Sequence, residues 1–365
     1  MEAGTASGIT LEELGLAARN HAMPLEALRH AVTPLGLHYL LIHFDIPAVD
    51  AAEWRLTLGG RVERPRELTL AELQALPQRT LPVTFECAGN GRALLEPRGS
   101  LSQPWLNEAV GTGEWTGTPL APLLEEAGVA SDAIDVVFTG LDRGAQGGVM
   151  QDYARALPIS EALREDVLLV WAINGQPLPP QHGHPLRVVV PGWYGMTQVK
   201  WLCAITVLAE PFRGWQQEVS YRMRQAEEEQ GEPVSRMRPR ALMVPPGVPD
   251  FFTRTRLLEP GMCLIEGRAW SGHGPIERVE ASVDGGDWRP AELGEHLSPY
   301  AWCGWSFEWQ AEPGAHELRC RASDAAGQAQ PEEPEWNLDG FCNNAPQRVA
   351  VLVGERPELL LPSLS

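Results

Sequence analysis

Near residue 236 the hydrophobic pattern changes from a mixture of helical and strand-like runs to strand-like runs alone. This change limits the folds that the sequence can adopt. Before it, short helical patterns mix with strand-like runs without a regular strand–helix–strand alternation, which is typical of an α+β domain. After it, alternating runs such as residues 279–283 are separated by turns such as residues 284–286, which favours an immunoglobulin-like sandwich. The sequence therefore predicts an α+β domain over residues 1–235, with a short N-terminal helical extension, and an all-β sandwich over residues 236–365.

The size and charge of the chain limit its partners. Its 365 residues suit about two domains, and a hydrophobic fraction of 44% supplies enough material for two cores. Lys and Arg number 29 against 48 Asp and Glu, which gives a net charge of −19. Such a surface should repel nucleic acids and anionic membranes, so we expect neither as a partner. An anionic ligand would need a local basic pocket.

The sequence shows no recognisable membrane or export segment. The apolar run at residues 167–173 is far shorter than the ~20 residues of a membrane span and is typical of a buried strand. The N-terminal residues lack the basic and apolar regions of a secretory signal, and no twin-arginine pair precedes an apolar run. We therefore predict a cytoplasmic location for this sequence.

Local signals place several elements within the first domain. Capping boxes at Thr10–Glu13 and Thr69–Glu72 predict two helix starts, and Pro119 and Gly128 are expected to begin and end a third helix. The expected strands are residues 54–58, 135–139, 167–173, 186–190 and 199–208. This mixture of short helices and strands supports the α+β prediction.

The cysteine and glycine patterns disfavour several kinds of cofactor. None of the six cysteines belongs to a C-x-x-C pair, which disfavours zinc ribbons, c-type haem attachment and thioredoxin chemistry. The chain also lacks a G-x-G-x-x-G turn after a strand and a Walker loop, so nucleotide-cofactor binding is unsupported. Scattered cysteines in a large chain are most often free, buried thiols, although one of them, Cys87, lies in an unusual setting.

Cys87 belongs to the segment Thr84–Arg92, where a strand-like run delivers it into a loop of small residues. Gly89 and Gly91 permit close backbone approach of a bulky group, and Arg92 can lower the thiol pKa or hold an anion. These residue types favour a functional thiol and a structural thiol beside a turn about equally.

A second unusual segment covers residues 181–201. His182, Arg187 and Lys200 lie in or beside a valine-rich run that is expected to form a buried strand. A buried arginine requires an anionic partner, which an internal carboxylate or a bound anion would supply. A metal site at His182 and His184 is a weaker alternative, because no further ligands follow at suitable spacing.

Several motifs in order along the chain resemble the sulfite oxidase family of molybdopterin enzymes. The resemblance is carried by Cys-Ala-Gly-Asn-Gly-Arg at residues 87–92, His-Gly-His-Pro-Leu-Arg at residues 182–187 and Val-Lys-Trp-Leu at residues 199–202. It extends over about residues 39–353, which is nearly the whole chain. It implies a mixed α+β molybdopterin domain followed by an immunoglobulin-like dimerisation domain, and hence a homodimer.

The resemblance also implies roles for individual residues. Cys87 would be the thiolate ligand of molybdenum, for which a soft ligand is suitable, and Asp142 would accept hydrogen bonds from the pterin ring. The residues that would hold the pterin phosphate are His43, His182, Arg187 and Lys200. The substrate site would contain Arg92, Trp115 and a tyrosine whose position falls at Ser220 or Tyr221.

The substrate site departs from the pattern of sulfite oxidases, which line it with several arginines. Two of those positions are Leu41 and Asp339 in this chain. A hydrogen bond to a charged group contributes roughly 1.5–3 kcal/mol, so the loss of two predicts about 3–6 kcal/mol less stabilisation of a small dianion. Asp339 would add repulsion if it points inward. Sulfite is therefore expected to be a poor substrate, and neutral or cationic substrates become credible.

Together these residues predict a divergent, haem-free, bacterial-type molybdenum oxidoreductase that transfers an oxygen atom to or from a small substrate. One alternative is a reductase of sulfoxide-like compounds, which a less positive pocket would suit. Another is a non-catalytic dimeric binding protein that keeps the fold, although a scaffold would need no soft ligand such as Cys87. No haem-binding module is recognisable in the sequence, so we expect electrons to pass to a separate carrier.

Overall fold

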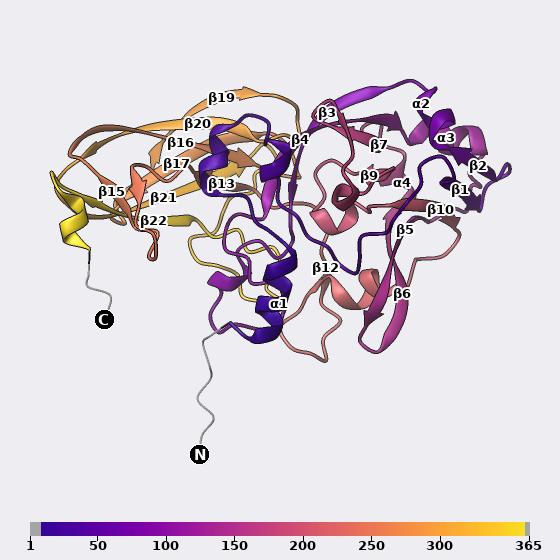
Figure 1. The fold of residues 1–365 in the computed structure, drawn as a ribbon, viewed down its shortest axis with the longest axis horizontal. Helices are drawn as coiled ribbons and strands as arrows, with labels where there is room; N and C mark the ends of the chain where they lie inside the picture. The colour runs from indigo at the N-terminus through magenta and orange to yellow at the C-terminus, as the bar shows by residue number, and fades with distance from the viewer. Residues whose placement is uncertain (1–8, 362–365) are drawn as a thin grey trace, which may run out of the picture.

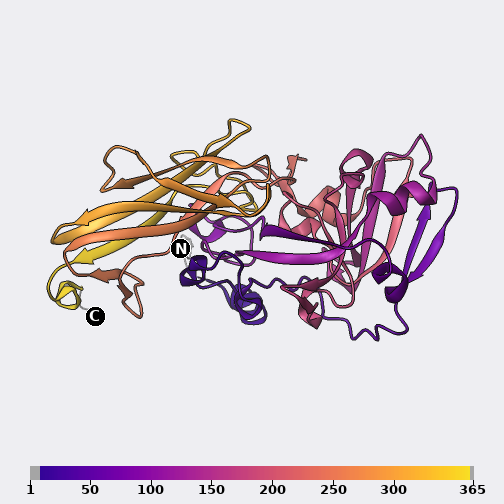
Figure 2. The same ribbon diagram turned by 90° about the horizontal axis from the view of Figure 1, so that it is seen from above.

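The computed structural model describes residues 9–361, which form two lobes arranged along the longest axis of the molecule (Figures 1 and 2). The lobe on the right in Figure 1 combines sheets with short helices, and the lobe on the left is an all-β sandwich. This arrangement confirms the predicted fold class. Within the described residues, no helix is long and apolar enough to cross a membrane. Residues 1–8, which entered the prediction about an export signal, lie outside the described part.

The first lobe, called here the α+β lobe, is built on two sheets. One sheet has the strand order β2-β1-β10-β5-β6, with β1 and β10 parallel and the other neighbours antiparallel. Its strands are β1 (Arg55–Gly60), β2 (Arg66–Thr69), β5 (Asp135–Gln146), β6 (Val149–Pro158) and β10 (Leu202–Leu208). The other sheet has the antiparallel order β3-β4-β7-β8, with β9 also paired to β7. Its strands are β3 (Arg79–Glu86), β4 (Val110–Pro119), β7 (Leu168–Ile173), β8 (Gln176–Pro177) and β9 (Arg187–Val189).

Short helices accompany these sheets, and the capping boxes predict two of them correctly. The α-helices are α1 (Leu11–Arg19), α2 (Leu70–Gln74), α3 (Ala121–Ala127) and α4 (Ile159–Ala162). Thr10 Oγ1 accepts from the Glu13 backbone N–H at 3.2 Å, and Thr69 Oγ1 accepts from that of Glu72 at 3.1 Å. The remaining single-turn helices are Leu25–Arg29, Leu35–Leu37, Arg92–Leu94, Pro180–His182, Gly195–Thr197, Gln216–Ser220 and Pro357–Leu360.

The predicted limits of the third helix are half right. Gly128 ends α3 in the left-handed conformation, with φ of 71°, as expected of a glycine cap. The predicted start at Pro119 is wrong, because Pro119 is the last residue of β4 and pairs with Leu168 there. A proline is tolerated at a strand end, where no ladder hydrogen bond requires its nitrogen. The helix begins at Ala121, with Pro122 in its first turn.

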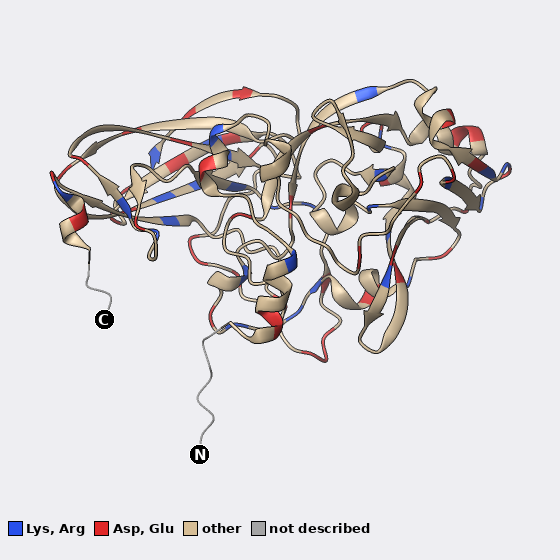
Figure 3. Cartoon of the chain, in the orientation of Figure 1, with Lys and Arg blue, Asp and Glu red and all other residues tan. Residues whose placement is uncertain are grey.

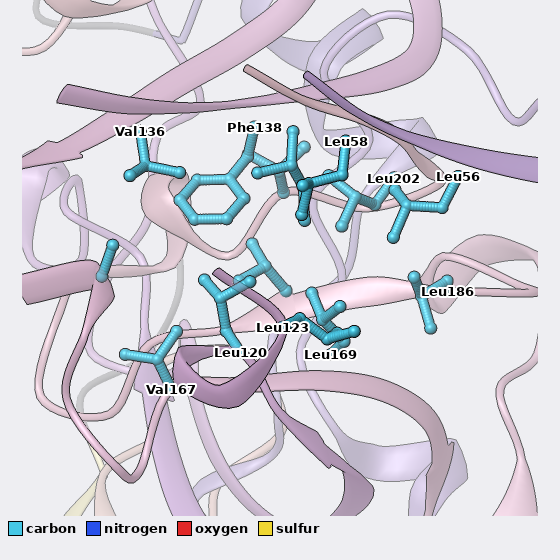
Figure 4. Close-up of a cluster of buried hydrophobic side chains, with 14 of the residues drawn as sticks. Leu56, Leu58, Leu120, Leu123, Val136, Phe138, Val167, Leu169, Leu186 and Leu202 are labelled. Carbon is cyan, nitrogen blue, oxygen red and sulfur yellow. The ribbon is translucent and has the colours of Figure 1, made fainter. Parts of the chain in front are cut away.

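The core of the α+β lobe lies between its two sheets (Figure 4). Leu56 and Leu58 of β1 and Phe138 of β5 belong to the same buried cluster as Leu123 of α3 and Leu169 of β7. Burying a side chain of this size contributes about 1.5–3 kcal/mol, so the cluster stabilises the relative placement of both sheets. The valine-rich strand β9 is buried along its whole length, which confirms that prediction.

The second lobe, called here the sandwich, packs two sheets face to face. Their strand orders are β13-β16-β20-β19 and β14-β15-β22-β21-β17-β18. The first sheet contains β13 (Arg240–Met243), β16 (Gly261–Trp270), β19 (Glu292–His296) and β20 (Cys303–Ala311). The second contains β14 (Val248–Pro249), β15 (Arg256–Leu258), β17 (Ile276–Val283), β18 (Arg289–Pro290), β21 (Gly314–Asp324) and β22 (Gln347–Val353). Alternate residues of β20 and β21 face the shared core, as the period-two pattern predicts.

The two lobes meet through a buried contact region. A small ribbon of β11 (Arg222–Met223) and β12 (Glu232–Pro233) precedes the sandwich. Trp270 and Trp302 of the sandwich share one apolar cluster with Ala88 and Tyr194 of the α+β lobe. Helix α1 lies below the junction of the two lobes in Figure 1. The loop that follows β3 is therefore held from both lobes.

Candidate active site

The Cys87 loop begins where β3 ends. The Cys87 backbone N–H donates to Ala109 O at 2.9 Å, and Cys87 O accepts from the Asn90 N–H at 2.9 Å. Gly89 leaves room for the Arg92 guanidinium, since a Cβ at residue 89 would lie 2.7 Å from Arg92 Cζ. The bulky group that Gly89 admits is thus the Arg92 side chain itself, whereas a Cβ at residue 91 would meet the side chains of Asn343 and Arg240. Burial raises the pKa of the Cys87 thiol, and the Arg92 charge opposes that shift only in part.

Cys87 lies where two cavities meet. The inner cavity has a volume of about 70 Å³ and the outer cavity one of about 290 Å³. The residues that line both are Leu41, His43, Cys87 and Tyr221. The structure therefore brings the predicted molybdenum ligand to the junction between the predicted cofactor residues and the predicted substrate residues.

Two cations line the inner cavity, the buried Arg187 and the half-buried Lys200. Lys200 Nζ donates to Leu41 O at 2.8 Å and to Gln181 O at 3.2 Å, and burial followed by the Arg187 charge lowers the pKa of Lys200 to about 7. Arg187 donates to Gln198 O at 2.9 Å, and burial lowers its pKa to about 10. No Asp or Glu within residues 9–361 forms an ion pair with either side chain. The internal salt bridge that the sequence left open is therefore not formed, and Arg187 keeps a positive charge without a carboxylate partner, which a bound anion could pair with.

The two histidines of the predicted phosphate set line the inner cavity as neutral groups. Burial, followed by the charges of His38, Arg187 and Lys200, lowers the pKa of His182 to about 2. Burial also lowers the pKa of His43, whose Nε2 lies 2.9 Å from Gln146 Oε1. Both imidazoles can therefore donate hydrogen bonds to an anion but add no charge at neutral pH. The structure brings both predicted histidines to the inner cavity, beside Arg187 and Lys200.

Asp142 is the predicted pterin acceptor, and its surroundings fit that role. Burial raises its carboxyl pKa to about 6, with the Lys200 charge opposing the shift. Within the described chain, Asp142 Oδ1, Arg187 Nε and His38 Nε2 are buried and lack a hydrogen-bond partner, and all three residues line the inner cavity. Unpaired buried polar atoms are costly, so this set of one acceptor and two nitrogens fits a polar, anionic ligand such as a pterin phosphate.

Arg92 projects into the outer cavity, as predicted. Its Nε donates to Asp339 O at 2.6 Å and its Nη1 to Ser102 Oγ at 2.6 Å, while its guanidinium lies 4.9 Å from the centre of the Phe341 ring. Repulsion from Asp339 was expected only if its side chain points inward, and the Asp339 carboxylate is instead paired with another arginine. The Asp339 carboxylate pairs with Arg224 Nε at 2.9 Å, and only the backbone carbonyl of Asp339 faces Arg92.

Trp115 is misplaced by the sequence prediction. Its side chain is fully buried, its Nε1 donates to Val83 O at 3.3 Å, and it lines neither cavity of the described structure. Its ring stacks on Phe85 and lies 4.9 Å from the Arg187 guanidinium. Trp115 therefore supports the inner-cavity cation from behind, because the Trp115 side of β4 packs into the lobe interior. The tryptophan that lines the outer cavity is Trp105, which no sequence signal separated from the other twelve.

The lining of the two cavities favours Tyr221 over Ser220 as the tyrosine of the substrate site. Tyr221 lines both of them, whereas Ser220 lines only the outer one and accepts from Gln146 Nε2 at 3.2 Å. Burial raises the pKa of Tyr221 to about 12, so its phenol stays protonated and can donate a hydrogen bond. Tyr39 and Tyr153 also line the inner cavity and were not predicted, since isolated tyrosines carry no pattern.

The described residues contain no group of three or more His, Cys, Asp or Glu side chains that could hold a metal ion by themselves. The alternative of a metal site at His182 and His184 is therefore unsupported, and His184 does not belong to the described lining of either cavity. Cys87 is a single soft ligand, which suits a metal whose other ligands arrive with an organic cofactor.

Family models match both lobes. The model described as the oxidoreductase molybdopterin binding domain matches residues 43–216, and the Mo-co oxidoreductase dimerisation domain matches residues 253–354.

Known proteins resemble the chain over most of its length. It is 34% identical to a sulfite oxidase of Arabidopsis thaliana, with 88% of each chain covered. It is 33% identical to the mitochondrial sulfite oxidase of Homo sapiens and 30% identical to nitrate reductase [NADH] 1 of Arabidopsis thaliana, and it spans 62% and 39% of those two chains. Among solved structures, the sulfane dehydrogenase SoxCD of Paracoccus pantotrophus matches with a TM-score of 0.78 and 25% identity, covering 95% of this chain and 92% of that one.

Proposed function

The chain belongs to the sulfite oxidase family of molybdopterin-dependent oxidoreductases, and we propose that it transfers an oxygen atom to or from a small substrate where its two cavities meet. The observation that carries this proposal is the position of Cys87. It lines a cavity with Arg187 and Lys200 on one side and a larger cavity with Arg92 and several apolar side chains on the other. A cofactor in the first cavity would thus meet a substrate in the second beside this thiol.

The residues of the inner cavity fit the molybdenum–molybdopterin cofactor of the family. Arg187 and Lys200 would pair with the phosphate, and neutral His43 and His182 would donate hydrogen bonds to it. The unpaired Asp142 Oδ1 would accept from a pterin N–H, and Cys87 would be the protein ligand of the metal. When bound, the cofactor supplies the two-electron chemistry of oxygen transfer.

The protein's own contribution is binding, charge and exclusion of water. A phosphate beside Lys200 would favour its charged form and raise its pKa from about 7. Arg92 has Nε and Nη1 committed to protein oxygens, so it is held rigidly beside Cys87 and can stabilise negative charge on a substrate oxygen. Tyr221, protonated and at the junction, can donate a hydrogen bond to the same oxygen.

We infer that sulfite is a poor substrate because of Leu41 alone, without a contribution from Asp339. Leu41 lines both cavities and places an alkyl group where the family pattern has an arginine. The loss of one charged hydrogen bond weakens stabilisation by roughly 1.5–3 kcal/mol, which is about half of the loss expected from the sequence. The paired Asp339 carboxylate adds little to it.

The direction of oxygen transfer is open to a direct test. Oxidation of sulfite consumes water and releases sulfate, two protons and two electrons, which a soluble ferricyanide acceptor would take up. Reduction of a dialkyl sulfoxide consumes two protons and two electrons from a reduced viologen and releases a sulfide and water. The apolar side chains of the outer cavity, Leu41 among them, favour the second reaction as the alternative function.

The proposal is tested by metal analysis together with a cysteine substitution. We expect about one molybdenum and one pterin per chain, and Cys87→Ser should abolish turnover even where pterin is retained. Cys263→Ser is the matched control, because Cys263 is a half-buried free thiol of the sandwich, far from the cavities. A Cys87→Ser protein with full activity, or purified protein without molybdenum, would contradict the proposal.

Three further features are proposed on the same basis. The sandwich would mediate a homodimer, and sedimentation that shows only a 40.0 kDa species at micromolar concentration would contradict this. Electrons would leave or arrive through a separate carrier protein. We predict a cytoplasmic location, which cell fractionation would test. We also predict a domain limit near residue 236, which limited proteolysis would test.

A further inference from the structure

The outer cavity is positive in a protein that is otherwise strongly acidic. Arg92 and Arg19 line it, and no Asp or Glu belongs to its described lining, although the chain carries a net charge of −19 and acidic residues occur across both lobes (Figure 3). Because unlike charges raise the local concentration of a ligand, this lining selects against cations. The cationic substrates that the sequence left open are therefore disfavoured.

Several large apolar side chains line the outer cavity beside its polar groups. Leu16, Leu41, Phe44, Leu101, Trp105 and Phe341 contribute to its lining. Its volume of about 290 Å³ is roughly twice the ~150 Å³ that accommodates benzene. A four-atom oxyanion would occupy only a small part of this space. The cavity suits a molecule with an organic body.

Arg19 holds a fixed place at this cavity. It is the last residue of α1, and the next residue, Asn20, is buried and accepts from the Ile42 N–H at 2.6 Å while donating to Gln103 Oε1 at 3.0 Å. The helix is further tied down by an ion pair between Glu13 and Arg98. The backbone that carries Arg19 is therefore anchored to two segments of the outer-cavity wall.

The Arg19 side chain itself is exposed and uncommitted. It forms no hydrogen bond or ion pair with any other residue in the described range 9–361. Its charge nevertheless reaches the junction, because it contributes, after burial and Lys200, to the lowered pKa of His43. A guanidinium with five free donors at the edge of an apolar cavity is suited to bind a carboxylate or a similar anion.

We propose that Arg19 is a specificity-determining residue that binds the terminal anionic group of an organic substrate, whose apolar body fills the outer cavity and whose reacting atom lies near Cys87 and Arg92. This inference rests on the proposed function, since it assigns the substrate class of the same site. It supplies an arginine from α1 to the cavity in which Leu41 stands at the position of a family arginine.

The test compares two ligands that have the same organic body and differ in the charge of the terminal group. The probes are 4-(methylsulfinyl)butanoate and its uncharged amide, titrated into the cofactor-loaded enzyme by calorimetry. We expect the carboxylate to bind about fivefold more tightly, which is the upper range for an exposed charge. The preference should fall as ionic strength rises from about 0.01 M to about 1 M. In Arg19→Gln it should disappear while binding of the amide stays unchanged.

Arg29→Gln is the matched control, because it removes the same charge from an exposed arginine that lines neither cavity in the described structure. It should keep the preference. Equal binding of the two probes by the wild type, no binding of either at millimolar concentration, or a preference that survives in Arg19→Gln would each overturn the inference. Molybdenum content and turnover are measured on the same samples. A molybdenum-containing, active enzyme without the preference refutes only the role of Arg19, whereas protein without molybdenum refutes the proposed function.

Discussion

Removal of the Arg240 guanidinium should destabilise the protein more than any surface substitution, because Arg240 joins the two lobes under the Cys87 loop. Its Nη1 pairs with Glu86 Oε1 at 2.9 Å, and both side chains are 2% exposed. The same guanidinium donates to Asn343 O at 2.9 Å and to Asn107 Oδ1 at 2.6 Å. Arg240→Met keeps the alkyl stem and removes all of these contacts.

The magnitude follows from what remains around Glu86. Its carboxylate would keep only Trp270 Nε1 at 2.9 Å and Asn90 Nδ2 at 3.0 Å, which leaves a buried charge without its counterion. Removal of one partner of a buried pair costs about 3–5 kcal/mol, a large part of the 5–15 kcal/mol that is typical for a folded protein. At roughly 2–4 °C per kcal/mol, the melting temperature should fall by about 6–20 °C.

The assay is calorimetric melting of the purified protein, together with a double-mutant cycle. Because Glu86→Gln removes the orphaned charge, the double variant Glu86→Gln with Arg240→Met should be destabilised by at least about 1 kcal/mol less than the sum of the single changes. Molybdenum content should fall in Arg240→Met, since Glu86 directly precedes Cys87.

The control is Arg278→Met, at an arginine that is 60% exposed on the same sandwich and should change stability by no more than about 0.5 kcal/mol. The reasoning is refuted if Arg240→Met lies within about 1 kcal/mol of the wild type, or if the two single changes are strictly additive. Either result would mean that the buried pair does not hold the lobes together.

Three shorter predictions concern the cavities and the core. Between pH 7 and 10.5, Lys200 keeps its proton in the unfolded chain but has released it in the cofactor-free folded protein. The free energy of unfolding should therefore rise with pH by up to ~1.4 kcal/mol per pH unit. In urea unfolding, Lys200→Met should flatten this rise, and pH profiles of equal slope for the variant and the wild type would contradict the lowered pKa. Leu41→Arg should raise kcat/KM for sulfite at least about tenfold, or ~1.4 kcal/mol, at unchanged pterin content, whereas Leu14→Arg, which adds the same charge outside both described cavities, should leave it unchanged. Phe138→Ala should cost about 3–5 kcal/mol in urea unfolding, because its ring is fully buried between the sheets; a loss below about 1 kcal/mol would show that the core collapses around the vacancy.

Local patterns determined much of the fold before any tertiary contact was considered. The capping boxes at Thr10 and Thr69 form as predicted, because a cap depends on three or four consecutive residues. The period-two alternation after residue 236 corresponds to the sandwich for a similar reason. The Cys87 loop and the basic residues around Arg187 were also recognisable, since rare residue types in a fixed order carry information without any geometry.

What the sequence alone could not decide is which side chains face the cavities. Trp115 belongs to a recognisable motif yet lies behind Arg187, whereas Trp105 lines the outer cavity without any signal. Asp339 stands at a position implied to face the substrate, but its carboxylate turns to Arg224. Arg19 of α1 lines the outer cavity although no motif in the sequence singles it out. Orientation and pairing depend on contacts between residues far apart in the chain, and those contacts exist only once the lobes have packed; a local pattern records the kind of residue but not the direction in which the folded backbone points it.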